Sequence, residues 1–191
     1  MARGLGKEGG GSGIEDLRVR QEKTDEVLVF TDGSMIGGWV GAGWWRRDNG
    51  GVEYGARIPL GKEMEVYDSE LVGIEAGIRN GLLMAVQEGR KQILVLSDNQ
   101  AAVQRMGRRE ASSGEAVVQR VWALVARTER HGITVTVGWV KGHCGVEGNE
   151  QADRLAKAGA QMARGGRHAY TSIAYLRRRT RSWGTHTAEQ A

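Results

Sequence analysis

The chain has 191 residues, a formal net charge of +4, 40% hydrophobic residues and 26% charged residues. This size and composition fit one soluble domain with a sizeable core and leave little room for two. No apolar run approaches the length of a membrane span, and the glycine-rich start lacks the apolar segment of a secretory signal, so we expect an intracellular protein without a membrane partner. The single cysteine, Cys144, excludes an internal disulfide and a thiolate-rich zinc site.

The two ends of the chain differ from its middle in composition. Residues 1–26 mix glycine with charges of both signs, which predicts a flexible leader or linker. Residues 163–191 form a basic tail with six arginines against one glutamate, and residues 171–179 fit a short amphipathic helix. Such a tail is either a solvated segment or a contact for phosphates. Residues 27–162 are the predicted folded domain.

The first predicted strand, 27–34, is a run of apolar and β-branched residues that reaches Asp32, where Gly33 and Ser34 fit a tight turn. Two further strands, Val40–Arg47 and Gly51–Ile58, flank an Asn-Gly step that favours a hairpin. Pro59 is expected to end the third strand because proline cannot donate to a ladder.

From Asp68 the apolar residues recur at steps of three and four, which predicts a helix that ends near Gly89, with Asp68 or Ser69 as its cap. A second buried strand, 92–98, again stops at an aspartate. Helices over 99–106 and 115–130, a strand over 133–140 and a helix over 149–158 complete the chain. Four tryptophans are expected in the core or on a sheet face: Trp44, Trp45, Trp122 and Trp139.

This order of elements predicts an α/β fold in which a five-stranded mixed sheet, three antiparallel strands plus two parallel ones, carries helices on both faces. Four carboxylates take comparable places in it: Asp32 and Asp98 at strand ends, Glu70 in the first turn of the long helix, and Asp153 on the last helix. Each alone also fits a turn, a cap or an exposed helical charge. Together they are expected at one crevice, because the two strands that end in aspartate should be neighbours.

Carboxylates that gather in this way repel by about 4 kcal/mol for a pair 4 Å apart at an effective dielectric near 20, unless a cation joins them. Ligands that offer only oxygen favour Mg²⁺ or Mn²⁺ over zinc. Two such ions can activate a water on one side of a phosphodiester and stabilise the leaving oxygen on the other. The sequence therefore predicts phosphodiester hydrolysis with two Mg²⁺ ions, for which Mn²⁺ can substitute.

Four segments carry a family resemblance: Thr31–Ser34, Tyr67–Leu71, Leu96–Gln100 and Trp139–Ala156. They resemble the motifs of type 1 ribonuclease H domains, and the resemblance spans residues 27 to about 160. It looks closest to the ribonuclease H domain that follows reverse transcriptase in the polyproteins of non-LTR retrotransposons. This implies a ribonuclease H-like fold and an upstream reverse transcriptase domain as a partner.

The resemblance implies that Asp32, Glu70, Asp98 and Asp153 hold the two metals as catalytic residues. It further implies that His143, in a mobile loop beside them, assists turnover through proton transfer or product release. A Cys–His dyad of Cys144 with His143 is a weaker interpretation, because neighbouring loop positions need not face each other and no third orienting group is evident.

The implied substrate is an RNA–DNA hybrid, cleaved in its RNA strand by a monomer. Several cellular members of the family have Asn and Gln where this chain has Val66 and Tyr67. We therefore expect hybrid contacts from backbone and phosphate-binding positions: Gly33, Ser34, Asn99, Gln100, Arg105, Arg108 and Arg109. A non-catalytic hybrid-binding module and a two-metal nuclease acting on DNA remain as alternatives.

Overall fold

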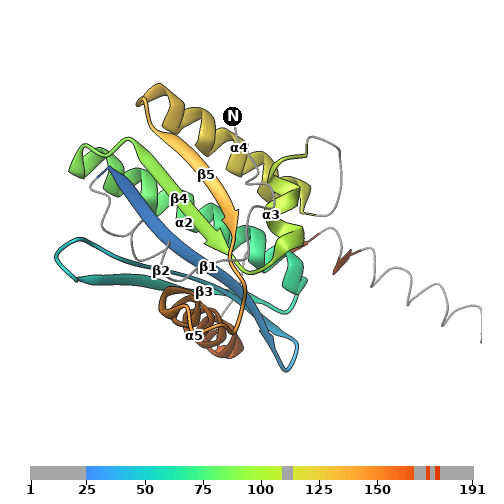
Figure 1. Cartoon of the computed structure of the whole chain (residues 1–191). Helices are drawn as coiled ribbons and strands as arrows, with labels where there is room; N and C mark the ends of the chain where they lie inside the picture. Colours follow the sequence, from blue (N-terminus) through green and yellow to red (C-terminus); the bar gives the residue numbers. More distant parts are fainter. Residues whose placement is uncertain (1–24, 109–113, 166–170, 173–174, 177–191) are drawn as a thin grey trace, which may run out of the picture.

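The computed structural model describes residues 25–108, 114–165, 171–172 and 175–176 (Figure 1). Its five strands form one sheet in the order β3-β2-β1-β4-β5. The central strand β1 (Glu26–Ile36) pairs antiparallel with β2 (Trp39–Arg47), which pairs antiparallel with β3 (Glu53–Gly61). On its other side β1 runs parallel to β4 (Gln92–Ser97), which runs parallel to β5 (Thr134–Trp139). The predicted α/β fold with a five-stranded mixed sheet is confirmed.

The apolar run of β1 is continuous because both faces of this strand are covered. Val27 and Val29 belong to one hydrophobic cluster, whereas Leu28 and Phe30 belong to a second cluster on the opposite face. The alternation follows from the two-residue period of a strand. The first predicted strand is therefore a buried central strand, as its composition indicated.

The end of β1 differs from the sequence-based expectation. Gly33 and Ser34 do not form a tight turn, because both pair with β2 inside the ladder. The chain turns instead at Gly37 and Gly38, whose φ angles of 59° and 79° lie in the left-handed region that glycine adopts without strain. The strand therefore runs four residues beyond Asp32.

Pro59 is also placed differently, since it lies inside β3 rather than at the end of that strand. Its partner is Gly41, where the register between the two strands shifts. Because β3 is an edge strand, one side of its backbone needs no ladder partner, and proline is tolerated there.

The long helix α2 (Val66–Glu88) begins two residues before Asp68, and its N-cap is Glu65. Neither Asp68 nor Ser69 caps it, because the Ser69 hydroxyl donates to the carbonyl of Val66 at 2.6 Å. The helix ends at Gly89 in the left-handed conformation, as predicted. Its predicted apolar positions are buried except the last, Val86: Leu71, Ile74, Ile78, Leu82 and Ala85.

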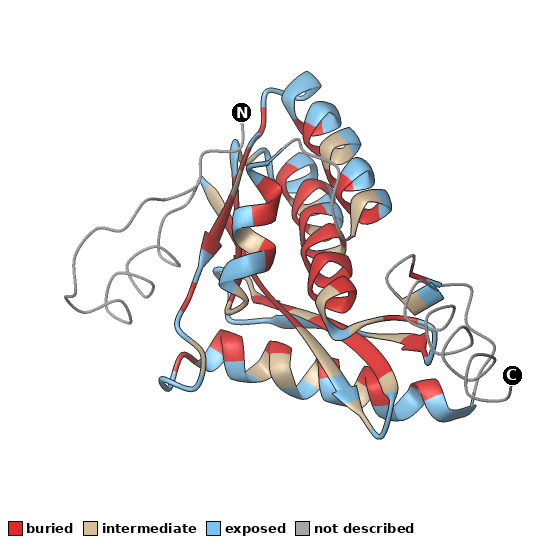
Figure 2. Ribbon diagram, turned by 90° about the vertical axis from the view of Figure 1, so that its right-hand side faces the viewer, coloured by how far each residue is buried: buried red, intermediate tan, exposed pale blue. Residues whose placement is uncertain are grey.

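Helices cover both faces of the sheet (Figure 2). One face carries α2, α4 (Glu115–Arg130) and the short α3 (Gln100–Met106), and the other carries α5 (Glu147–Met162), which continues into the 3-10 turn η1 (Ala163–Gly165). A Cβ added at Gly43 of β2 would lie 2.5 Å from the Ala156 nitrogen. Glycine in β2 thus lets the small residues of α5 pack directly on the sheet.

No helix among the described ranges is long and apolar enough to cross a membrane. Most of the predicted leader and of the predicted tail helix lies outside the described residues. Of the tail, Thr171 and Ser172 contact the segment before α2, where the Thr171 hydroxyl donates to a Glu63 carboxylate oxygen and the Ser172 amide to the Glu63 carbonyl, both at 2.7 Å.

Candidate metal centre and active site

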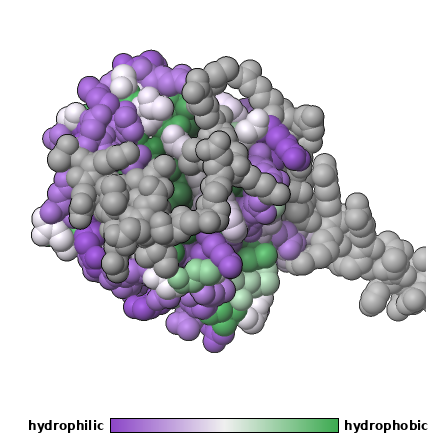
Figure 3. Space-filling model, in the orientation of Figure 1, coloured by the Kyte–Doolittle hydropathy of each residue, from purple (hydrophilic) through white to green (hydrophobic). Residues whose placement is uncertain are grey.

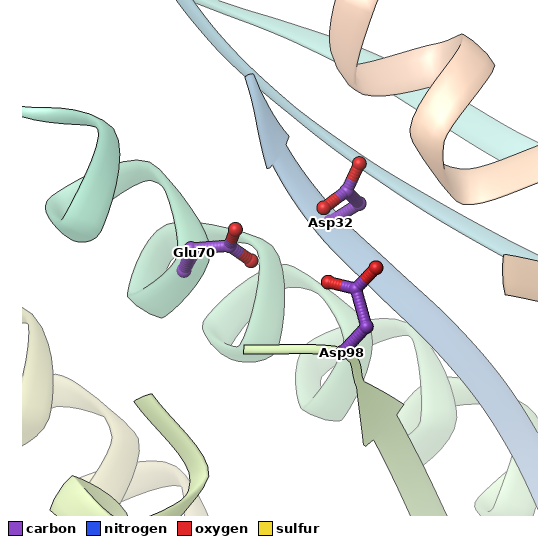
Figure 4. A group of neighbouring side chains, drawn as sticks. All are labelled: Asp32, Glu70 and Asp98. Atoms are coloured by element: carbon purple, nitrogen blue, oxygen red, sulfur yellow. The ribbon is translucent and has the colours of Figure 1, made fainter. Parts of the chain in front are cut away.

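Three of the four predicted carboxylates converge where β4 ends beside β1 (Figure 4). Asp32 of β1, Glu70 of α2 and Asp98, directly after β4, each offer one carboxylate oxygen, and these oxygens all lie within 4.8 Å of one another. No other group of this kind occurs among the described residues. This separation suits ligands of shared divalent cations.

Strand register brings the two aspartates together. Thr31 pairs with Ser97 across the parallel β1–β4 ladder, so the residues that follow them, Asp32 and Asp98, emerge side by side. Glu70 joins them because α2 packs closely on β1. A Cβ at Gly33 would lie 2.7 Å from the Glu70 nitrogen, so only glycine leaves room for the first turn of the helix.

The cluster gathers three acids that have no cationic side-chain partner among the described residues. Burial, together with the charges of Asp98 and Asp153, raises the pKa of Asp32 from 3.8 to about 8. Burial raises the pKa of Glu70 from 4.5 to about 9, with Asp32 and Asp98 adding to the effect. The Gly33 amide opposes both shifts.

A divalent cation fits this site on two observations. The donor set consists of carboxylate oxygens alone, which suits Mg²⁺ or Mn²⁺. In addition, Oε2 of Glu70 is buried without any hydrogen-bond partner among the described residues. A buried acceptor of this kind is costly unless a partner completes it.

The fourth carboxylate, Asp153 on α5, lies near the cluster but outside the 4.8 Å group. Its Oδ2 accepts from the Lys157 ammonium at 2.7 Å, one helical turn away. Asp153 nevertheless raises the pKa of Asp32, which places its charge at the same crevice. The structure thus brings three predicted ligands within 4.8 Å of one another and places the fourth beside Asp32, paired with a cation.

Asp98 is held by the segment that joins β5 to α5. The Asn149 side-chain amide donates to Oδ2 of Asp98 at 3.1 Å, and the Trp139 indole N–H donates to the Asp98 carbonyl at 2.9 Å. A Cβ at Gly142 would lie 2.6 Å from the same Oδ2. Asn149 lies in the motif Trp139–Ala156 and at the start of the predicted helix 149–158, so its local pattern indicates a helix start and gives no sign of this contact.

His143 lies in the loop between β5 and α5, is exposed, and is the single described residue other than glycine with a positive φ, 55°. Its neighbour Gly142 abuts Asp98, so this loop borders the carboxylate cluster. Backbone conformations of this kind are uncommon outside glycine and concentrate at functional sites.

The predicted hybrid-contacting residues fall into different environments. Asn99 caps α3 by accepting from the Ala102 amide at 3.0 Å, and its side chain also lowers the pKa of Glu70. Gln100 is exposed, as is Arg108, while Arg109 lies outside the described residues. Gly33 and Ser34 are half-buried in β1.

Arg105 is buried, with 5% of its surface exposed. Its guanidinium donates to the Arg108 carbonyl at 2.7 Å and to a Glu115 carboxylate oxygen at 2.6 Å. These contacts tie the end of α3 to the start of α4. A surface pocket of about 310 Å³ opens beside Arg105 and Arg108, but none of the four carboxylates lines it, and it is not the candidate site.

The tryptophans are distributed unevenly. Trp45 is 3% exposed, and Trp44 and Trp122 pack at the edge of the core, as expected. Trp139 differs from the expectation, since 48% of its surface is exposed. Its hydrogen bond to Asp98 fixes the ring at the end of β5, beside the cluster.

A family model described as RNase H matches residues 24–161. The chain is 31% identical over 159 residues to a ribonuclease H of Pseudomonas fluorescens, covering 75% of this chain and 96% of the relative. It is 33% identical over 153 residues to a ribonuclease HI of Neisseria meningitidis, covering 70% of this chain and 94% of the relative.

Solved structures share the fold. The N-terminal RNase H domain of a Mycobacterium tuberculosis protein superposes with a TM-score of 0.52 at 22% identity, over 72% of this chain and 98% of that one. A foamy viral protease–reverse transcriptase, solved with an RNA/DNA hybrid, superposes with a TM-score of 0.59 at 13% identity. This match covers 71% of this chain and 20% of the viral one.

Proposed function

Because the chain belongs to the RNase H family, we propose that it is a ribonuclease H that hydrolyses the RNA strand of RNA–DNA hybrids. The single observation that carries the proposal from family to chemistry is the convergence of Asp32, Glu70 and Asp98 without a cationic side chain bonded to any of them among the described residues. A protein that needed only a stable fold would gain nothing from placing these carboxylates close together.

In the proposed site, Asp32, Glu70, Asp98 and Asp153 bind two divalent ions, with Mg²⁺ as the expected metal. When bound, the ions supply an activated water on one side of the phosphodiester and stabilise the departing 3′ oxygen on the other. Asn149 and Trp139 hold Asp98 in place through its carboxylate and its carbonyl. Asn99 orients Glu70 from the N-terminus of α3.

His143 is proposed to assist proton transfer or product release. Its exposure and its place in the loop beside Asp98 support this role. Gly33, Ser34, Gln100 and Arg108 are proposed contacts for the hybrid. Arg105 supports Arg108 through the hydrogen bond to its carbonyl, so its proposed effect on phosphate binding is indirect.

A secondary proposal concerns the context of the chain. The sequence motifs favour a domain that works with a reverse transcriptase, and the shared fold with part of a foamy viral protease–reverse transcriptase is compatible with this. We propose a monomeric domain for this role. Gel filtration with multi-angle light scattering tests the state directly, and a stable dimer would contradict it.

The test of the proposed activity uses Mg²⁺ and an RNA–DNA hybrid labelled on each strand in turn, beside matched single-stranded and duplex RNA. We expect cleavage of the RNA strand of the hybrid alone, and its loss in Asp98→Asn. The matched control is Asp25→Asn, which removes a carboxylate that bonds the Lys91 amide at the opposite end of the sheet.

Three results would contradict the proposal in different ways. Binding of the hybrid without turnover at any Mg²⁺ or Mn²⁺ concentration would indicate a non-catalytic module. Cleavage of the DNA strand would indicate a related nuclease. Equal activity in Asp98→Asn and wild type would mean that the carboxylate cluster is not the site.

A further inference from the structure

β1 loses its neighbour at the level of the carboxylates. β4 pairs with β1 only as far as Thr31, whereas β1 continues to Ile36 with β2 as its one described partner (Figure 1). The stretch 33–36 therefore has no described strand partner on the side away from β2, and it leads from the carboxylates to the β1–β2 turn.

The side of α5 that borders this stretch carries a row of charges. Asp153, Lys157 and Arg164 lie four and seven residues apart, which places them on one side of the helix and its 3-10 extension. At 1.5 Å per residue, Arg164 lies about 16 Å from Asp153 along the axis. Its guanidinium reaches the β1–β2 turn, where Nη2 lies 3.4 Å from the position that a Cβ on Gly37 would take.

A second cation, Lys62, lies at the same end of the sheet as the β1–β2 turn. Lys62, directly after β3, places its ammonium 4.5 Å from the ring centroid of Trp39, the first residue of β2. A cation–π contact of this kind holds a long side chain in one place. Trp39 is half-buried.

These cations are free of carboxylates in the described part of the chain, where neither Lys62 nor Arg164 has an ion pair. Glu63, next to Lys62 in sequence, instead accepts from the Thr171 hydroxyl. Hydrophilic and hydrophobic surface lie side by side in the lower part of Figure 3, where α5 and the β1–β2 hairpin lie in Figure 1. Two positive charges beside an aromatic ring match a sugar–phosphate backbone.

We propose that Trp39, Lys62 and Arg164, the hairpin-end patch, bind the sugar–phosphate backbone of the hybrid on the β1–β2 side of the carboxylates. This inference rests on the proposed function and adds a substrate-binding surface to it. Lys62 and Arg164 neutralise phosphates, and Trp39 supplies an apolar face to a sugar or a base. Because Arg164 lies about 16 Å along the helix axis from Asp153, we expect the patch to act on affinity rather than on the chemical step.

The test compares two double variants with the same loss of charge. Lys62→Ala with Arg164→Ala removes both cations of the patch, and the control, Lys91→Ala with Arg130→Ala, removes two exposed cations at the opposite end of the sheet. Each pair is placed in the full chain, in an Asp98→Asn background for binding and with Asp98 intact for turnover. Hybrid binding is measured as a function of salt concentration.

For the patch variant we expect about 10-fold weaker binding at low salt and a slope of log K against log salt that is shallower by about 2, because two phosphate contacts are lost. KM should rise while kcat stays unchanged. The control should keep the wild-type slope. Trp39→Leu should weaken binding, and Trp39→Phe should restore most of it.

An unchanged affinity and slope in a patch variant that still cuts the hybrid would overturn the patch and leave the proposed function intact. Equal weakening in both double variants would also overturn it, since the effect would then reflect net charge alone. If the wild-type chain neither binds nor cuts the hybrid, the proposed function itself fails, and the patch falls with it.

Discussion

Two buried glutamates on α2 show what separates a candidate site from the scaffold. Glu70 and Glu75 are each 6% exposed and lie five residues apart on one helix. Glu75 accepts from the Arg120 guanidinium at 2.8 and 3.0 Å and from Arg79 at 2.9 Å. Glu70 has no such partner in the described part of the chain, and its pKa is raised to about 9.

The difference teaches that burial of an acid does not by itself mark a functional residue. Glu75 is buried with its counter-charges, so it joins α2 to α4 as a structural tie. Glu70 is buried beside two further acids, an arrangement that costs stability and is retained where the charge has a use. What distinguishes a candidate site residue is therefore a buried acid without a cationic partner, as at Glu70 in the described part of the chain, and not burial alone.

The largest expected effect follows from removing the charge of Glu70. Glu70→Gln should lower cleavage of the hybrid by at least about 100-fold, the size associated with loss of a group that acts electrostatically in an active site. In the metal-free protein the same change should raise the free energy of unfolding, because the fold no longer has to bury this acid and keep it protonated. Initial rates measure the expected loss of cleavage, and chemical denaturation measures the expected gain in the free energy of unfolding. A variant that is both active and less stable would place Glu70 with the scaffold.

The second expected effect, that of changing Glu75, is on stability rather than on activity. Glu75→Gln should lower the free energy of unfolding by about 1–3 kcal/mol, because Arg120 and Arg79 lose their buried acceptor, with part of the cost screened by their exposure. Urea denaturation measures this change. Cleavage at a temperature well below unfolding should stay near the wild-type rate, and a large drop in kcat would mean that Glu75 also serves the site.

The smallest effect concerns pH in the metal-free protein. Because the pKa values of Asp32 and Glu70 are about 8 and 9 in the folded state, the fold keeps protons there that the unfolded chain releases near pH 4. The free energy of unfolding should therefore fall as pH rises from about 4 to about 9, and Asp32→Asn should flatten that fall by at least about 1 kcal/mol. Thermal unfolding in a chelating buffer across this range provides the measurement. Mg²⁺ should stabilise the wild type most at the alkaline end, and a pH-independent stability would show that the cluster is not destabilising.

The local hydrophobic pattern was sufficient to predict the helices and strands whose apolar residues recur at a regular spacing. The step of three and four along α2 and the unbroken apolar run of β1 each reflect burial of one helix face or both strand faces. Asp32, Glu70 and Asp98 could be selected because they stand where such patterns end or begin. Their shared motif tied them to one family, which the comparisons support.

Contacts between distant segments decided the rest. The local sequence predicts a turn at Gly33, but in the structure this glycine leaves room for the backbone of α2. No neighbouring residue in the sequence indicates this contact. Arg105 was expected on the surface and is buried, because its partner Glu115 belongs to the next helix. Asn149 reaches Asp98 across 51 positions of sequence.

By itself, then, the sequence determined which segments become strands and helices and which carboxylates stand at their ends, since hydrophobic period and turn chemistry are properties of neighbouring residues. Only the tertiary structure decided which of those acids lie without a counter-charge, how far β1 extends past β4, and that Lys62 and Arg164 face the same end of the sheet. The reason is physical: strand register and the close approach of helices depend on packing between residues far apart in the chain, and charge pairing is settled only when that packing is complete.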